Sequence, residues 1–128
     1  MTALKQITAI RMKVYLGGPM TNVPYFNAPV FRFAAEFLRE KGHEVFSPVE
    51  QGAKLAGRDF HDDCPNGSPE EAAAVAFPLN KAMLEQLTFI CLEAEAVALL
   101  PGWRNSKGTT AEWAVATALG LPVMEITP

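Results

Sequence analysis

The sequence lacks three features that would place a protein in a membrane or outside the cell: long apolar runs, a leader-like start and paired cysteines. No apolar run reaches the roughly 18 residues that a membrane-spanning helix needs, and residues 1–12 lack the apolar stretch of a signal peptide. Cys64 and Cys91 form neither a CxxC pair nor a dense disulfide pattern, so we expect two free thiols. These absences predict a cytoplasmic protein without membrane contacts.

Positive charge is also scarce. The formal net charge is −3 at pH 7, whereas proteins that bind nucleic-acid backbones present concentrated lysine and arginine to the phosphates. We therefore expect no nucleic-acid partner, although a small anionic ligand needs only one local cation. At 128 residues, with 49% hydrophobic and 20% charged residues, the chain has the size and composition of a single globular domain, residues 1–128.

Two common ligand-binding signatures are missing. The segment 61–64 contains histidine, aspartate and cysteine, which are metal-ligand residue types, but not the spacing of metal ligands. The GxxxxGK[ST] spacing of a Walker loop is also missing. We expect neither a metal ion nor a bound cofactor.

Strand-like and helix-like patterns alternate along the chain, which indicates parallel β-α-β units. Strands are predicted at 12–16, 43–48, 95–100 and 121–126. Helices are predicted between Asn27, a candidate cap, and Gly42, and at 69–76, 80–92 and 110–119. Residues 51–69 lack periodicity and are predicted to form a surface excursion or a lid. The pattern predicts an open parallel sheet of about four to five strands with helices on both faces, which binds ligands beyond the carboxyl ends of its strands.

Two loops follow the predicted strands at that edge, residues 17–20 and 101–108. Glycines in them let backbone amides approach a ligand closely. Ser106, Lys107 and the helix start beyond Gly108 supply hydrogen-bond donors and positive potential for a phosphate. The alternative is a glycine-rich turn that serves only the chain geometry.

Three side chains near these loops each have two interpretations. Thr109-Thr110-Ala111-Glu112 fits the S/T-x-x-E capping box, in which the carboxylate only satisfies backbone amides. Alternatively, Glu112 faces the ligand crevice, ionised by the helix dipole, and attacks a sugar carbon. Tyr15 is either a packed strand aromatic or a ligand-facing residue, and Trp103 either anchors its loop or stacks on a base.

Several segments together resemble the nucleoside 2-deoxyribosyltransferase-like superfamily, in particular its small, often phage-encoded members that act as deoxynucleoside 5′-monophosphate N-glycosidases. The resemblance extends from Lys13 to Val123, except for residues 51–76. The matching segments are Tyr15-Leu16-Gly17-Gly18-Pro19-Met20-Thr21, Gly42-His43-Glu44-Val45-Phe46-Ser47-Pro48, and Leu99-Leu100-Pro101-Gly102-Trp103 followed by Ser106-Lys107-Gly108 and Glu112. It implies a flavodoxin- or Rossmann-like three-layer sandwich.

The resemblance assigns roles to these residues. It implies that Glu112 attacks the anomeric carbon of a deoxyribose and that Tyr15 orients this glutamate. A serine six residues before the nucleophile, here Ser106, is typical of relatives that act on 5′-monophosphates, and Lys107 lies beside it. The implied substrate-binding residues are Gly17, Gly18, Pro19, Met20, Gly102, Trp103, Ser106, Lys107 and Gly108. Relatives form dimers or larger assemblies, so a homo-oligomer is expected.

One departure from the family pattern concerns the leaving base. An aspartate that handles its proton is usual where this chain has Gln86, and glutamine is no carboxylic acid. Proton donation would then fall to a nearby carboxyl group, for which the candidates are Glu85, Glu95, Asp59 and Asp62. The leading hypothesis is therefore cleavage or transfer at an N-glycosidic bond through a glycosyl-glutamate intermediate. The alternative is a nucleotide-binding module with weak or no activity.

Overall fold

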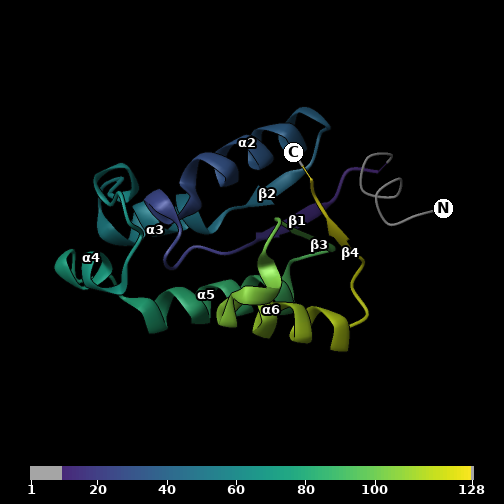
Figure 1. The fold of residues 1–128 in the computed structure, drawn as a ribbon. Helices are drawn as coiled ribbons and strands as arrows, with labels where there is room; N and C mark the ends of the chain where they lie inside the picture. The colour runs from purple at the N-terminus through teal and green to yellow at the C-terminus, as the bar shows by residue number, and fades with distance from the viewer. Residues whose placement is uncertain (1–9, 128) are drawn as a thin grey trace.

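A computed structural model describes residues 10–127. Most of residues 1–12, for which the sequence predicts no signal peptide, lies outside the described residues. The centre is a four-stranded parallel sheet with the order β2-β1-β3-β4 (Figure 1). Its strands are β1 (Lys13–Gly17), β2 (Glu44–Phe46), β3 (Ala96–Leu99) and β4 (Val123–Glu125). The predicted parallel sheet is confirmed, and the strand order changes direction between β1 and β3, where such sheets bind ligands.

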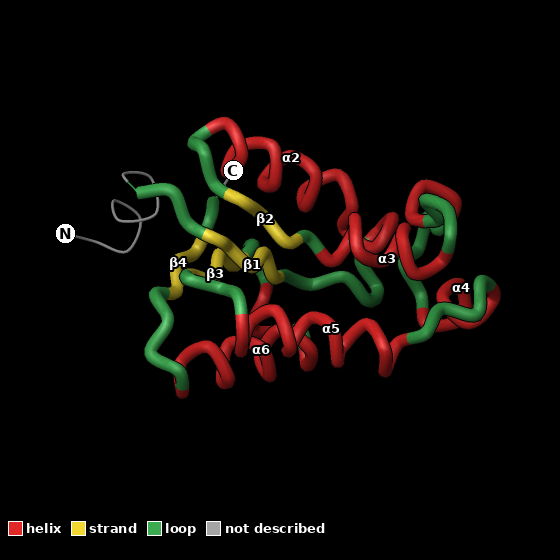
Figure 2. Tube along the Cα trace, turned by 180° about the vertical axis from the view of Figure 1, so that it is seen from behind, coloured by secondary structure: helices red, strands yellow, loops and turns green. Residues whose placement is uncertain are grey.

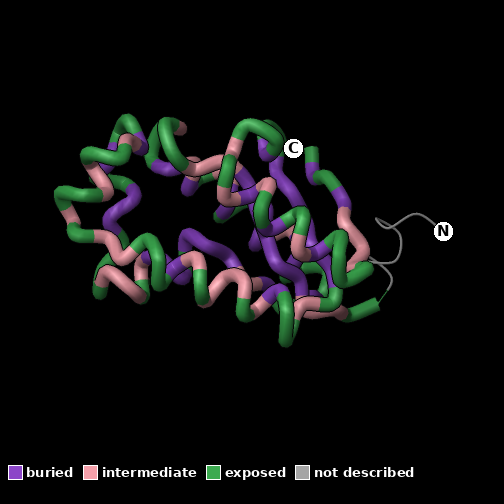
Figure 3. The backbone as a smooth tube through the Cα atoms, turned by 90° about the horizontal axis from the view of Figure 1, so that it is seen from below, coloured by how far each residue is buried: buried purple, intermediate pink, exposed green. Residues whose placement is uncertain are grey.

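Side chains of β1 alternate between two cores. Val14 and Leu16 pack in the first core with helix α2 (Ala28–Glu40). Tyr15 points to the second core, which lies beneath helices α5 (Leu79–Leu92) and α6 (Lys107–Ala118). Helices therefore cover both faces of the sheet, and Figure 2 shows the three layers from behind. Figure 3 shows the strands buried between them.

The prediction of an aperiodic segment over 51–69 is wrong at its start. Helix α3 (Pro48–Ala56) follows β2 directly, because Pro48 suits the first helical position and Gly57 ends the helix in a left-handed conformation. Helix α3 packs against α2 and α5. Its Gly52 faces the imidazole of His61 closely, since a Cβ there would lie 3.3 Å from Nε2. The second strand is correspondingly shorter than predicted.

The rest of the excursion has a small apolar core of its own. Phe26, Phe60 and Cys64 form this third cluster, and His61 stacks on Phe60 with 4.2 Å between ring centroids. The predicted short helix is confirmed as α4 (Pro69–Ala74), which Ser68 caps. Single helical turns complete the chain: η1 (Pro24–Asn27), η2 (His61–Asp63) and η3 (Trp103–Asn105).

Several smaller expectations can be compared with the described residues. Asn27 occupies the cap position of α2, but its side chain does not cap the helix and instead donates to the Pro19 carbonyl oxygen (3.0 Å). Cys64 and Cys91 are free thiols, as predicted. Within residues 10–127 no helix is long and apolar enough to cross a membrane. The same residues contain no cluster of three or more potential metal ligands.

Candidate active site

The central contact of the site joins a strand to a helix. The Tyr15 hydroxyl donates a hydrogen bond to Glu112 Oε2 over 2.6 Å. Tyr15 is completely buried and Glu112 is 4% exposed. The predicted meeting of these two side chains is confirmed, across 97 positions of sequence.

Burial sets the protonation of this pair. Loss of water around Glu112 raises its pKa from 4.5 to about 7, although the hydrogen bond from Tyr15 opposes the increase. The pKa of Tyr15 is well above 10, first because of its burial and then because of the neighbouring carboxylate. Tyr15 therefore stays a hydrogen-bond donor, while Glu112 changes charge near neutral pH.

The capping-box interpretation of Glu112 is wrong. Helix α6 begins at Lys107, three residues before the predicted start at Thr110, and Ser106 is its N-cap. The Ser106 Oγ accepts a hydrogen bond from the Thr109 amide (3.2 Å). Glu112 consequently lies in the second turn, where its carboxylate faces Tyr15 rather than the amides of the helix start.

The two loops at the carboxyl edge are held together by Thr109. Its buried Oγ1 donates to the Gly18 carbonyl oxygen (2.9 Å) and lies 3.0 Å from Ser106 Oγ. Gly18 packs tightly on β3, since a Cβ at this position would lie 2.8 Å from the Leu100 Cβ. The glycine turn therefore has a packing role, and it also keeps the loop close to the start of α6.

The other predicted ligand-binding residues lie in these loops and at the start of α6. Pro19 lies close to Gly102, where a Cβ would be 3.5 Å from the proline Cγ. Met20 is partly buried between the first and third cores. Gly108 faces helix α5, since a Cβ there would lie 3.4 Å from the Met83 Cε. The Lys107 side chain is exposed.

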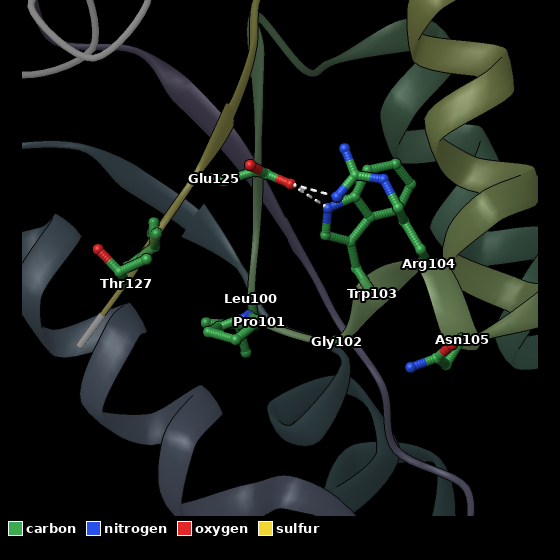
Figure 4. Close-up of a pocket in the computed structure, with 9 residues that line it drawn as sticks. Leu100, Pro101, Gly102, Trp103, Arg104, Asn105, Glu125 and Thr127 are labelled. Carbon is green, nitrogen blue, oxygen red and sulfur yellow. Dashed lines mark hydrogen bonds and ion pairs between the residues drawn. The ribbon is translucent and has the colours of Figure 1, made fainter.

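Trp103 is an anchor of the loop after β3. It is 5% exposed, and its Nε1 donates to Glu125 Oε1 over 2.7 Å. Arg104 donates to the same oxygen (2.9 Å), and its guanidinium lies 4.5 Å from the centroid of the Trp103 ring. Figure 4 shows these three side chains beside an open pocket of about 400 Å³. Of the two interpretations, the structure favours loop anchoring over base stacking.

Three of the four candidate proton donors lie away from Glu112. Glu95 precedes β3 at the opposite edge of the sheet, where its Oε1 accepts from the Lys13 amide (2.9 Å). Asp59 and Asp62 form ion pairs with Arg32 of α2, and α2 covers the other face of the sheet. Glu85 alone among the four belongs to the helix layer that carries Glu112.

A second open pocket, of about 380 Å³, lies beyond the end of β2, and Glu85 lines it together with Phe46 and Ser47. Phe46 stacks on Tyr15 with 5.5 Å between the ring centroids, so this aromatic pair connects the pocket to the Tyr15 and Glu112 contact. Tyr15 and Glu112 themselves line neither pocket.

Gln51 of α3 and Gln86 of α5 take part in hydrogen bonds that join these two helices. Gln51 is buried, and its Nε2 donates to the Ala82 carbonyl oxygen and to Glu85 Oε1, each over 3.0 Å. Gln86 donates to Gln51 Oε1 over 2.9 Å. Gln86, where the sequence departs from the superfamily that it resembles, therefore lies in one hydrogen-bonded network with Gln51 and Glu85.

One protein family matches the sequence over nearly the whole described fold. The family described as "Domain of unknown function (DUF4406)" matches residues 12–125. The chain belongs to this family. The matched region of the DUF4406 domain includes all four strands and both Tyr15 and Glu112. Neither the curated proteins nor the solved structures gave a significant match.

Sequence reasoning missed two contacts of the DUF4406 domain. The spacing around Thr109 predicts a capping box, and nothing in it indicates the bond to Gly18. The sequence pattern predicts a strand at Phe46 but not that Phe46 is the β2 partner of Tyr15 in the sheet register. Pairing the aromatic residues of two adjacent predicted strands could have found the second contact.

Proposed function

We propose that this domain cleaves or transfers the N-glycosidic bond of a deoxynucleoside 5′-monophosphate, as its resemblance to the nucleoside 2-deoxyribosyltransferase-like superfamily implies. The hydrogen bond between Tyr15 and Glu112 is the observation that carries the proposal. It holds a buried carboxylate with a pKa of about 7 against Tyr15 of β1, one of the two strands between which the strand order changes direction. A carboxylate removed from water is a stronger nucleophile than a solvated one.

The proposed reaction has two steps. A Glu112 oxygen attacks the anomeric carbon, the carbon–nitrogen bond breaks, and the base departs with the bonding electron pair and takes up a proton. Water or a second base then attacks the same carbon and gives its proton to the group that protonated the leaving base, while the bond from the carbon to Glu112 breaks and its electron pair returns to the carboxylate. Tyr15 bonds only Oε2, so it can orient the carboxylate while the other oxygen makes the attack.

The start of α6 supports a phosphate-bearing ligand. The helix has 12 residues, and its N-terminus provides positive potential together with the exposed side chain of Lys107. Ser106 caps the helix through its Oγ and would share that hydroxyl with a ligand. Glycines 17 and 18 bring the facing loop close to this helix start.

Glu85 is the best-supported donor for the proton of the leaving base. It lines the pocket that adjoins Tyr15 through Phe46, and within residues 10–127 its Oε1 accepts a hydrogen bond from Gln51 while Oε2 has no protein partner. The aromatic ring of Phe46 and the carboxyl group of Glu85 give this pocket the surfaces that a heterocyclic base requires. General acid assistance is worth roughly 10²–10⁴-fold in rate.

The alternative function is nucleotide binding without catalysis. Two observations favour it: an amide occupies the position of the usual aspartate, and the Tyr15 and Glu112 pair lies outside both pockets. The two functions differ in their products, because only the enzyme releases a free base.

The decisive experiment incubates the protein with deoxynucleosides and their 5′-monophosphates and follows the free base by chromatography. We expect release from a monophosphate, and loss of release in Glu112→Gln with nucleotide binding retained, because the nucleophile acts mainly in the transition state. Glu85→Gln should lower the rate by roughly 10²-fold or more.

Two controls separate the possible results. Glu93→Gln changes an exposed glutamate that forms an ion pair with Lys13 and should release base at the wild-type rate. Binding of monophosphates without any base release over days would favour the binding module. Equal affinity for a nucleoside and its monophosphate would remove the phosphate site from the proposal.

A further inference from the structure

One of the two pockets has no role in the proposed reaction. It is the open pocket of about 400 Å³ beyond the ends of β3 and β4, which we call the β4 pocket (Figure 4). Leu100 and Ile126, both buried, line it beyond the two strands, and Arg104 and Asn105 line it from the single turn η3. Apolar walls with a few polar groups are the usual composition of a small-molecule site.

Arg104 gives the β4 pocket a planar surface. Its guanidinium lies over the Trp103 ring, 4.5 Å from the centroid, and Trp103 is fixed by burial and by its bond to Glu125. Trp103 thus covers one side of the guanidinium, while the Arg104 side chain is 72% exposed and its other side is open. An open guanidinium plane is a surface on which heterocyclic rings stack.

The polar groups of this pocket suit the edge of such a ring. Glu125 Oε1 accepts hydrogen bonds from Trp103 (2.7 Å) and Arg104 (2.9 Å), whereas Oε2 has no protein partner within residues 10–127. Oε2 can therefore accept from a ring N–H or amino group. The guanidinium of Arg104 has five N–H donors, so several remain for a ring nitrogen or carbonyl oxygen.

A planar heterocycle fits the β4 pocket better than a phosphate or an alkyl chain. A phosphate would have to compete with the Glu125 carboxylate, which already neutralises Arg104. An alkyl chain would remove water from both charged groups without giving them a new partner, which costs free energy.

The β4 pocket has a counterpart at the other end of the same sheet edge. The β2 pocket, lined by Phe46 and Glu85, lies beyond β2. The strand order β2-β1-β3-β4 separates the two pockets by about 12–14 Å, at about 4.8 Å per strand. The start of α6 lies between them, because Thr109 bonds the Gly18 carbonyl oxygen of the loop after β1.

From this arrangement we propose that the β4 pocket binds a second heterocycle, which makes the ligand a dinucleotide with two nucleosides joined by a 5′,5′-pyrophosphate. The inference rests on the nucleotide site proposed above, whose 5′-monophosphate is then one half of the ligand. In doubly wound sheets a dinucleotide lies across the point where the strand order reverses, with its pyrophosphate at a helix N-terminus. Here the pyrophosphate lies at the start of α6, one ring occupies the β2 pocket, and the second ring stacks on Arg104.

The test is isothermal titration calorimetry with three matched probes for each of the four bases. They are the deoxynucleoside 5′-monophosphate, the 5′-diphosphate, and the symmetrical dinucleotide in which two such nucleosides share a 5′,5′-pyrophosphate. Stacking of the second ring should make the dissociation constant of at least one dinucleotide roughly tenfold lower than that of its diphosphate. The diphosphate separates the effect of the second ring from that of the second phosphate.

Substitutions of Arg104 locate the second ring. Arg104→Ala should abolish the preference for the dinucleotide, and so should Arg104→Lys, because an ammonium group keeps the charge but has no plane for stacking. Neither should change the affinity for the monophosphate. Arg58→Ala is the matched control, because Arg58 is an exposed arginine that pairs with Asp63 and lines neither pocket.

Equal affinities for the diphosphate and the dinucleotide would overturn the inference, as would a dinucleotide preference that persists in Arg104→Ala. Assays of base release separate this inference from the proposed function. Base release from a monophosphate by a protein without dinucleotide preference would overturn only the second ring site. A dinucleotide preference without base release would support that site and overturn the proposed reaction, and absence of binding to every probe would overturn both.

Discussion

Among single residues, Glu112 combines deep burial with a charge that changes near neutral pH. Its carboxylate has lost most of its water, and the Tyr15 hydroxyl returns only one hydrogen bond. A buried carboxylate costs free energy when it is ionised. Proteins retain such groups mainly where the chemistry needs them, which is why Glu112 is the centre of the proposed reaction.

This burial predicts a pH-dependent effect of Glu112→Gln on stability. The pKa of Glu112 is higher in the folded than in the unfolded chain. The free energy of unfolding therefore decreases as pH rises from 4.5 through about 7. A neutral glutamine avoids this cost. The variant should be more stable than wild type at pH 8 by up to roughly 3 kcal/mol, and the difference should vanish near pH 4. Urea unfolding at the two pH values measures it, and a pH-independent difference would contradict the burial argument.

The Tyr15 hydroxyl should tune the titration of Glu112. Its hydrogen bond lowers the pKa of the carboxyl group, so Tyr15→Phe should move the titration midpoint above about 7. Carboxyl ¹³C resonances of the folded protein report the midpoint directly. Tyr25→Phe is the matched control, because Tyr25 is the other tyrosine of the chain and is 39% exposed. An unchanged midpoint in the Tyr15 variant would show that the hydroxyl does not stabilise the ionised form.

At the scale of elements, the site depends on how closely the loop after β1 approaches β3 and α6. Gly18 allows this approach because a Cβ would meet the Leu100 side chain at 2.8 Å. Thr109 fixes the approach with a buried hydrogen bond to the Gly18 carbonyl oxygen. The loop, the end of the strand and the start of the helix are therefore held together.

Alanine substitutions at Gly18 and Gly108 should change the stability for different reasons, close packing at Gly18 and helix propensity at Gly108. Gly18→Ala should destabilise the fold by about 1–3 kcal/mol, because the new methyl group forces the loop away from β3. Gly108→Ala should be neutral or stabilising within about 1 kcal/mol, since the position is helical and its nearest neighbour is the flexible Met83 side chain. Denaturant unfolding measures both changes. Equal effects at the two positions would refute the packing argument.

At the scale of the whole molecule, the excursion after β2 is attached to the loop after β1. The Asn22 amide donates to the Gly67 carbonyl oxygen (2.7 Å) and the Tyr25 amide donates to that of Cys64 (3.0 Å). Asn22 and the three residues 25–27 have positive φ angles, which cost non-glycine residues free energy. The attachment to the excursion helps to hold this strained loop in place.

Substitution of Gly67 should therefore loosen the distant loop after β1. Gly67 has a φ of +59°, and a Cβ there would collide with the Val23 carbonyl oxygen. In Gly67→Ala we expect amide hydrogen exchange to accelerate in residues 20–27 and 60–77. Exchange in β1 and β3 should remain slow, because the first and second cores do not include the excursion. Gly57→Ala has a similar φ but open space around its Cβ, so it should leave residues 20–27 unchanged.

The sequence alone was sufficient to predict the alternating elements and the parallel sheet, because hydrophobic periodicity and turn residues are local signals. The sequence was insufficient where one segment fits more than one local structure. The motif that ends at Glu112 fits a capping box, but Ser106 starts the helix earlier. The sequence pattern does not predict helix α3, because its buried face contains Gln51 and Gly52 rather than apolar side chains. Gln51 is buried against the Ala82 carbonyl oxygen and Gly52 against His61, and neither contact is visible in the local sequence.

The order of strands and helices and the placement of the two loops at one edge were determined by the sequence, since these follow from each segment by itself. Tertiary structure alone decided the environment of the site. It buried Glu112 and raised its pKa to about 7, and it brought Glu85 rather than Glu95 to the pocket beside Tyr15. The physical reason is that desolvation and hydrogen bonding depend on every segment packed around a group, and these segments are distant in sequence.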